Sequence, residues 1–265
     1  MAPRTAAKRE PSNDRPWKPD FAQTAHGTLN GEQLTLHNIR NTRYGAPGTP
    51  YDTVWDTRRY DLSRLRRVWF IVEPFRPSLP VVAHNLLSFE FAEDFLAFSA
   101  EARLERGESY SILRGMRGGF ELAYTFGDER DFIARRTNYL DHHLYLYPLR
   151  VLPEAARALL LRLVATANDL TTQPRFYHSA FENCTSVLAK HANEVCPGAF
   201  PPFLIAQVMP GRSDKVLYDK GWLDTHLPWD EVRAAFDVKA RANAAGNALE
   251  FSRVIRESIG AMGTG

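Results

Sequence analysis

The apolar residues of this chain change their spacing once, near Pro153, and that change constrains the fold more than any other feature. Before it, apolar residues fall in short runs bounded by turn residues, which is typical of strands. We predict strands at "VWFIVEPF", "AHNLLSFEFA", "DFLAFSAEAR", "FELAYTFG" and "HHLYLYPL", and a hairpin at Asn30-Gly31 within "GTLNGEQLTLHNI". After it, "LPEAARALLLRLVATANDL" has the spacing of a long helix, and a second helix is expected from about Asn183.

Strands that come first and helices that follow favour an α+β fold, with an antiparallel sheet packed against helices. Residues 1–20 are charged, contain proline and show no periodicity, so we expect a flexible N-terminal arm or linker there. Residues 21–265 are predicted to form a single α+β domain, with a helical, loop-rich C-terminal extension from about residue 197.

Net charge, apolar runs and cysteine count exclude only a few classes of partner and topology. A formal net charge of +2 with interspersed acidic residues, and no nucleic-acid-binding motif, argues against nucleic acid as a partner. No run of about 20 apolar residues could span a membrane, and "MAPRTAAKRE" lacks the apolar core of a signal peptide. Cys184 and Cys196 are the two cysteines, expected roughly 18 Å apart along one helix, too far for a disulfide.

Cys184 is the residue with the most chemical interest. Asn183 is a good N-cap, which would put Cys184 in the first turn, where free backbone N–H groups favour a thiolate. The same helix repeats apolar residues at Val187, Leu188 and Val195, so the cysteine lies on the face that packs against the sheet. A nucleophile at the base of a cleft and a small buried apolar side chain are both consistent with this pattern.

A nucleophilic cysteine needs a base, and the chain has eight histidines. His191 lies two turns along the same helix, about 10 Å away, and cannot reach the sulfur. His178 in the preceding loop could fold back, although nothing in the sequence requires it. His142 and His143 stand together before a strand, but no further ligands at suitable spacing accompany them, so no metal site is expected.

His84 stands at the start of an apolar strand, where a polar ring needs a partner. Pairing Phe91 with Phe95 in the following hairpin would place His84 opposite Ala102, and a shift of one residue would bring Glu101 or Arg103 there instead. Glu101 is then the natural residue to orient the imidazole. In the alternative interpretation, Glu101 is an ordinary polar residue on the solvent face of a strand.

Four segments together resemble a known family. They are "SFEFAEDFLAFSAEARLERGESYS", "GGFELAYTFGDERDFIARRTNY", "LYLYPLR" and "FYHSAFENCTS", which follow His84 in this order. In these motifs the chain resembles the N-terminal periplasmic domain family of the lipoprotein N-acylation transferase Lnb, from about Trp17 to Pro197. The order of histidine before cysteine is also similar to permuted papain-like enzymes such as the lecithin-retinol acyltransferases.

The resemblance implies a thiol-dependent acyltransferase with a permuted papain-like architecture, in which Cys184 is the nucleophile and His84 its base. It further implies that Glu101 orients His84 and that Asn183, Ser99 and Tyr177 line the site or assist the oxyanion. Tyr110, Arg103 and Arg136 lie in the same motifs and are expected to anchor loops.

On this view the reaction passes through an acyl-thioester and needs neither cofactor nor metal. The implied partners are a lipoprotein or lipid acyl donor and a membrane surface. The implied location is the periplasmic or extracytoplasmic face of that membrane, for which this chain would be a soluble fragment.

Two other classes of function remain open from the sequence. With water as the acyl acceptor the same site would be a thiol hydrolase, and a papain-like cysteine amidase or peptidase would need the same residues. A non-catalytic binding domain of the same fold is the third alternative, because motif matches do not transfer chemistry by themselves.

Overall fold

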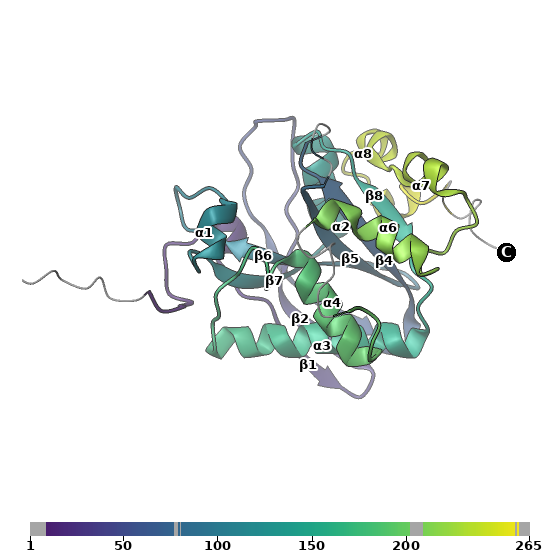
Figure 1. Cartoon of the computed structure of the whole chain (residues 1–265). Coiled ribbons are helices and arrows are strands. Elements are labelled where there is room, and N and C mark those ends of the chain that lie inside the picture. Colours follow the sequence, from purple (N-terminus) through teal and green to yellow (C-terminus); the bar gives the residue numbers. More distant parts are fainter. Residues whose placement is uncertain (1–8, 77–78, 80, 202–208, 258, 260–265) are drawn as a thin grey trace, which may run out of the picture.

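The computed structural model of the chain describes residues 9–76, 79, 81–201, 209–257 and 259, which build an eight-stranded sheet with helices packed on it. The strand order is β1-β2-β7-β6-β5-β4-β8, with β3 paired to β2 off this path; within the described residues only the β2–β7 contact is parallel. The strands are β1 His26–Asn30, β2 Gln33–Arg40, β3 Trp55–Asp61, β4 Leu65–Pro74, β5 Ala83–Phe91, β6 Phe95–Arg103, β7 Glu121–Gly127 and β8 Tyr145–Pro148. The predicted α+β fold with a mostly antiparallel sheet is confirmed (Figure 1).

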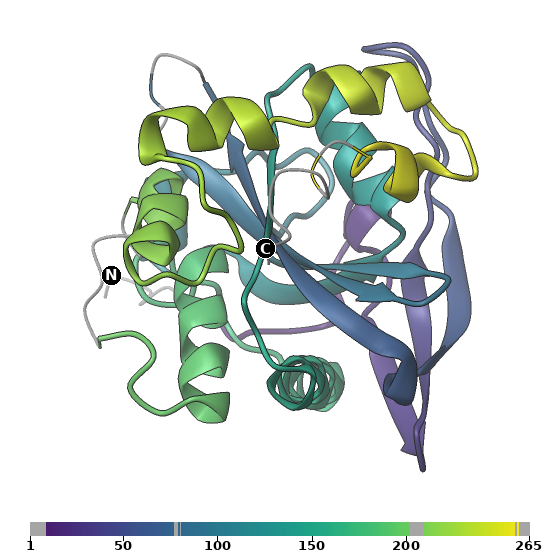
Figure 2. The ribbon, with the colours of Figure 1, turned by 90° about the vertical axis from the view of Figure 1, so that its right-hand side faces the viewer.

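Helices cover both faces of this sheet. The helix α3 (Pro153–Thr172) and the helix α4 (Cys184–Val195) pack against each other and against the sheet, as their apolar spacing predicts. Figure 2, which looks along α3, shows both on one side of the sheet and α2, α8 and α9 on the other. The remaining elements are α1 Ile112–Met116, α2 Glu129–Ala134, α6 Ser213–Asp219, α7 Trp229–Phe236, α8 Lys239–Ala245, α9 Phe251–Val254, and the short turns η1 Pro19–Phe21, η2 Leu62–Arg64, η3 Arg135–Tyr139 and η4 Pro210–Arg212.

The N-terminal hairpin forms as predicted. Asn30 pairs with Gln33, and Gly31 between them has φ = 58°, a left-handed conformation that glycine adopts without steric cost. The strand β3 that joins this hairpin was not predicted, because its sequence "WDTRRYD" is mostly charged. Among the described residues it pairs only with β2, and most of its residues are partly exposed or exposed, as is common for charged residues on edge strands.

We expected a flexible arm at residues 1–20, but the described part of it, from Arg9 onward, is held by specific contacts. Arg9 and Arg15 donate to the buried carboxylate of Glu121 at 2.8 and 2.7 Å. Trp17 is buried, with its indole N–H bonded to the Asn13 carbonyl at 2.7 Å. A buried carboxylate is costly without a cation, and these two arginines supply it, so residues from Arg9 pack against the sheet.

Candidate functional site

Cys184 is the first residue of α4, and its position follows from the cap that precedes it. The Asn183 Oδ1 accepts hydrogen bonds from the backbone N–H groups of Thr185 and Ser186, each at 2.9 Å. The Ser186 hydroxyl accepts from the Asn183 backbone N–H at 2.9 Å, which completes a capping box. The predicted helix start is confirmed, and the Cys184 residue there is only 4% exposed.

The sheet opens where α4 meets it. The β5–β6 ladder ends at the pair Leu87–Phe98, while β4 stays paired with β5 as far as Ala83. The helix α4 contacts both β5 and β6, and the backbone N–H of Asn85, beyond the end of the ladder, donates to the Cys184 sulfur. The separation of two neighbouring strands therefore creates the place that the thiol occupies.

The register of the β5–β6 hairpin decides which residue faces His84. Leu87 pairs with Phe98, and the same register continued along both strands puts His84 opposite Glu101 rather than Ala102. The prediction that a shift of one residue brings the carboxylate to the imidazole is confirmed by their contact.

His84 is the histidine that the structure brings to Cys184. The imidazole and the thiol line the same cavity, and each shifts the pKa of the other through its charge and hydrogen bonding. On the far side of the ring, His84 Nε2 lies 2.6 Å from Ser99 Oγ and 3.8 Å from Glu101 Oε1. At 3.8 Å the carboxylate acts through its charge rather than through a hydrogen bond.

The electrostatics of this group favour a thiolate and an imidazolium. Burial alone would lower the pKa of His84, but the Cys184 sulfur and the Glu101 carboxylate raise this pKa to about 9. Burial alone would raise the pKa of the Cys184 thiol, but the charge and hydrogen bond of His84 lower it, helped by the Asn85 backbone N–H. Each group therefore holds its partner in the charged form, as activated cysteines require.

Arg136 joins Glu101 to a second buried carboxylate. Its Nη2 lies 3.4 Å from Glu101 Oε1, and its Nε donates to Glu73 Oε2 at 2.6 Å. His142 Nδ1 lies 2.8 Å from the other oxygen of Glu73. Burial would raise the pKa of Glu73, but Arg136 and His142 lower it, so the carboxylate stays ionised. A continuous chain of contacts thus runs from His142 to His84.

Arg136 was expected to anchor a loop, and Glu73 was not among the predicted site residues. A signal for Glu73 was present, because an acidic residue inside the apolar strand "VWFIVEPF" needs a buried cation. The partner was not predictable, since Arg136 lies 63 positions later in the chain.

A cavity of about 370 Å³ opens beside the thiol. Tyr177, which was expected near the site, is buried at its wall, with its hydroxyl 3.3 Å from that of Tyr110. Arg103, in contrast, lies apart from the cavity and donates to the Phe21 carbonyl and to Asn13. The lining includes Glu73, Phe75, His84, Glu101, Tyr110, Ile112, Arg135, Arg136, Leu140, His142, Tyr177, Ser179, Asn183 and Cys184.

The other histidines near Cys184 in sequence do not reach it. His178 Nδ1 accepts from the backbone N–H groups of Ala180 and Phe181. His191 is buried between the Tyr124 hydroxyl and Glu194, at 2.9 and 3.0 Å. Among the residues that the structure describes, no group of three or more histidine, cysteine, aspartate or glutamate side chains is placed to hold a metal ion.

Comparison with known proteins identifies the family. The model of the Lnb N-terminal periplasmic domain matches residues 51–211, which is more than half of the chain and includes His84, Glu101 and Cys184. Searches of curated proteins and of solved structures find no match. In the described part of the chain, no helix has the length and apolar character needed to cross a membrane. The chain belongs to the Lnb N-terminal periplasmic domain family.

Proposed function

We propose that this protein is a thiol-dependent acyltransferase in which Cys184 is the nucleophile and His84 is its general base. The observation that carries the proposal is that the two side chains line one cavity at the start of α4, with the pKa of His84 raised and that of Cys184 lowered. A structural cysteine needs no such pairing, because a buried thiol is ordinarily neutral and its pKa raised.

The reaction would run in two halves. In the first, His84 takes the thiol proton, and the sulfur attacks the carbonyl carbon of an ester. The S–C bond forms, the C–O bond breaks, and the imidazolium returns the proton to the leaving alcohol. In the second, an amine attacks the acyl-thioester, its proton passes to His84, and the thiolate is released. Atoms and charges balance without a cofactor.

Oxyanion stabilisation is assigned to the backbone N–H of Cys184 at the positive end of α4. The Asn183 side chain is used by the helix itself, since its Oδ1 caps the first turn and its Nδ2 donates to the Ser179 carbonyl at 2.9 Å. Ser99 and Glu101 would hold the imidazole in place through Nε2. Tyr177 would shape the wall of the cavity rather than take part in proton transfer.

Apolar side chains around the cavity favour an acyl substrate over a polar peptide. Phe75, Ile112 and Leu140 line the cavity and are also solvent-exposed. Leu113 and Met116 extend this exposed apolar area along α1, where they are 67% and 50% exposed. Clustered exposed apolar residues mark binding surfaces, and a lipoprotein acyl donor at a membrane surface would contact this one.

The order of the site residues also favours a permuted papain-like arrangement. The base His84 lies on an early strand and the nucleophile Cys184 at the start of a later helix packed on the same sheet. Family membership supports a lipoprotein in the periplasm as the substrate context, because the family is defined by the periplasmic domain of Lnb.

The test uses a synthetic diacylated lipopeptide with a free N-terminal amine, presented in detergent micelles. We expect an acyl adduct on Cys184 and an N-acylated peptide, both read by tandem mass spectrometry, with the wild-type chain. The variant Cys184→Ser should lose both products. The matched control Cys196→Ser should keep them, because Cys196 is the exposed cysteine at the other end of α4.

Other products would change the conclusion. Release of free fatty acid without N-acylated peptide would make the protein a thiol hydrolase. Cleavage of a peptide bond in place of the ester would make it a cysteine peptidase. A folded wild-type chain that forms no adduct with any ester or amide would be a binding domain, and the proposal would be wrong.

A further inference from the structure

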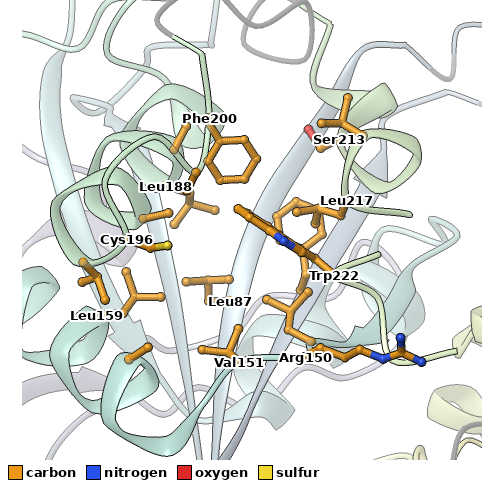
Figure 3. A pocket seen from close by; sticks show the side chains of 18 of the residues that line it. Leu87, Arg150, Val151, Leu159, Leu188, Cys196, Phe200, Ser213, Leu217 and Trp222 are labelled. Atoms are coloured by element: carbon orange, nitrogen blue, oxygen red, sulfur yellow. The ribbon is translucent and has the colours of Figure 1, made fainter. Parts of the chain in front are cut away.

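A second cavity, of about 300 Å³, runs along α4 from Thr185 to Cys196. Its walls come from α3, α4, α6, the central strands β4 and β5 and the loop after α4. Figure 3 shows Leu188, Phe200, Leu217 and Trp222 directed toward a common space, with Arg150 at its edge. The lining includes Phe70, Leu87, Leu149, Val151, Leu152, Ala155, Leu159, Thr185, Leu188, Ala189, Ala192, Val195, Cys196, Phe200, Ser213, Leu217 and Trp222.

The alternation of β5 separates this cavity from the first one. His84 lines the cavity that contains Cys184, and Leu87, on the opposite face of the strand, lines the second. Asn85 shares the face of Leu87, and its Nδ2 donates to the hydroxyls of Thr185 and Ser213 at 2.8 and 2.7 Å. The oxygens of these two hydroxyls lie at the second cavity and accept hydrogen bonds from Asn85.

The second cavity is therefore suited to hydrocarbon rather than to water. A buried water needs two to four polar partners. Apart from Arg150 at the edge, the Thr185 and Ser213 hydroxyls bonded to Asn85, the Cys196 thiol and the Trp222 indole, the side chains that line this space are hydrocarbon. An unfilled apolar cavity lowers stability in proportion to its volume. A 150 Å³ apolar cavity holds one benzene, so a cavity of about 300 Å³ has room for roughly a dozen carbon atoms.

We propose that this second cavity binds one unbranched alkyl chain. The chain would enter beside Arg150 and Leu152, which line the cavity while partly or largely exposed, and would extend inward toward Leu87. Arg150, whose Nε lies 3.2 Å from Asp224, would stand near the polar head of the ligand. This binding is separate from the acyl transfer proposed above, because a variant without the Cys184 thiol should still bind the alkyl chain.

The experiment is therefore done on the Cys184→Ala variant of the full chain, in which Cys196 is the remaining cysteine. Decanoate, dodecanoate and tetradecanoate are titrated by calorimetry below their micelle concentrations. Binding should tighten by about fourfold for each added methylene until the cavity is full. Cys196 lines the cavity, so a bound chain should also slow its alkylation by a bulky maleimide. This second readout places the ligand in this cavity rather than in the first.

Two substitutions on α3 provide a matched pair. Ala155→Phe adds a ring to the cavity wall, whereas Ala165→Phe adds the same ring on an exposed position of the same helix. We expect Ala155→Phe to weaken dodecanoate binding by roughly tenfold or more, and Ala165→Phe to change it less than twofold. Ala192→Phe on α4 is the second filling variant, for use if Ala155→Phe does not fold by circular dichroism.

A further arm separates a free fatty acid from the chain of a larger lipid. A lysophospholipid with a dodecanoyl chain should bind as dodecanoate does if the head lies outside at Arg150. If dodecanoate binds and the lysophospholipid does not, the cavity takes a free fatty acid. Both of these results support an alkyl site. No binding to the folded Cys184→Ala protein would mean that its own residues fill the space, and the proposal would be wrong. Binding that is unchanged in both filling variants would also overturn it.

Discussion

Two cavities meet at α4, where Cys184 lines the first and the next residue, Thr185, lines the second, and they differ in polarity and charge. The first contains Cys184, His84 and two buried carboxylates neutralised by Arg136. The second is lined almost wholly by apolar side chains, and the hydroxyls at its inner end are bonded to Asn85. The difference arises because neighbouring residues on a strand point to opposite faces of the sheet.

One helix, α4, thus borders a site with charged side chains on one face and an apolar cavity on the other. A thiolate and an imidazolium stabilise each other in a polar, partly enclosed site, and an alkyl chain needs a site without unpaired polar groups. Substitutions that remove one element from one side should therefore leave the other side unchanged.

The largest effect is expected from Arg136→Met, which removes the cation between Glu73 and Glu101 and leaves these carboxylates to His142 and His84. We expect a loss of about 3–5 kcal/mol in the free energy of unfolding, measured in urea. The control is Arg157→Met, which removes an exposed pair with Glu32 and should cost less than about 1 kcal/mol. Equal losses in the two variants would contradict a role for Arg136 in holding the first cavity.

A smaller loss of stability is expected from Asn85→Ala, which removes the donor to Thr185 and Ser213 between the cavities. The free energy of unfolding should fall by about 1–3 kcal/mol. The pH dependence of Cys184 alkylation should stay the same, because the backbone N–H of residue 85 contacts the sulfur. The exposed Asn247→Ala serves as the control for stability. A shifted alkylation profile would show that the two cavities are coupled.

The pH dependence of Cys184 reactivity tests the thiolate directly. His84 lowers the thiol pKa, so alkylation by iodoacetamide should persist below the pH range of an ordinary thiol. In His84→Gln the charge and hydrogen bond of the imidazole are lost, and burial, the largest influence, then outweighs the Asn85 N–H. The thiol pKa should therefore rise, and the rate near neutral pH should fall roughly tenfold or more. His178→Gln, whose ring bonds within its own loop, should retain the wild-type profile. If it loses the low-pH reactivity instead, His178 is the base.

The smallest effect is expected from Glu101→Gln, which keeps the shape of the side chain and removes its charge. Because Glu101 helps to raise the pKa of His84 to about 9, the substitution should lower that pKa by about one unit or less. A raised histidine pKa stabilises the fold at pH below the ordinary histidine value, and this stabilisation is lost as the pH rises through about 9.

In Glu101→Gln that loss should begin at lower pH. An NMR titration of the His84 ring measures the shift, and the exposed Glu93→Gln is the control. An unchanged His84 titration in Glu101→Gln would remove Glu101 as the orienting charge.

Local signals in the sequence were enough for the elements that carry the site. The Asn30-Gly31 turn, the strands around His84 and Glu101, and the capped helix start at Asn183 depend on neighbouring residues and were predicted. The charged strand β3 was not, because pairing at the edge of a sheet rather than a local pattern makes it a strand. The pairing of Arg9 with Glu121 was not predicted either, because the two residues lie far apart in the chain.

The sequence by itself determined the type of the elements that carry the site and the residue at the start of α4, since spacing and capping act within a few residues. The tertiary structure decided which histidine meets Cys184, because that depends on the register of a hairpin one hundred residues earlier and on where β5 and β6 separate. It also decided that a thiolate site and an apolar cavity share one helix start. Packing brings distant side chains together, and no pattern of neighbours encodes that contact locally.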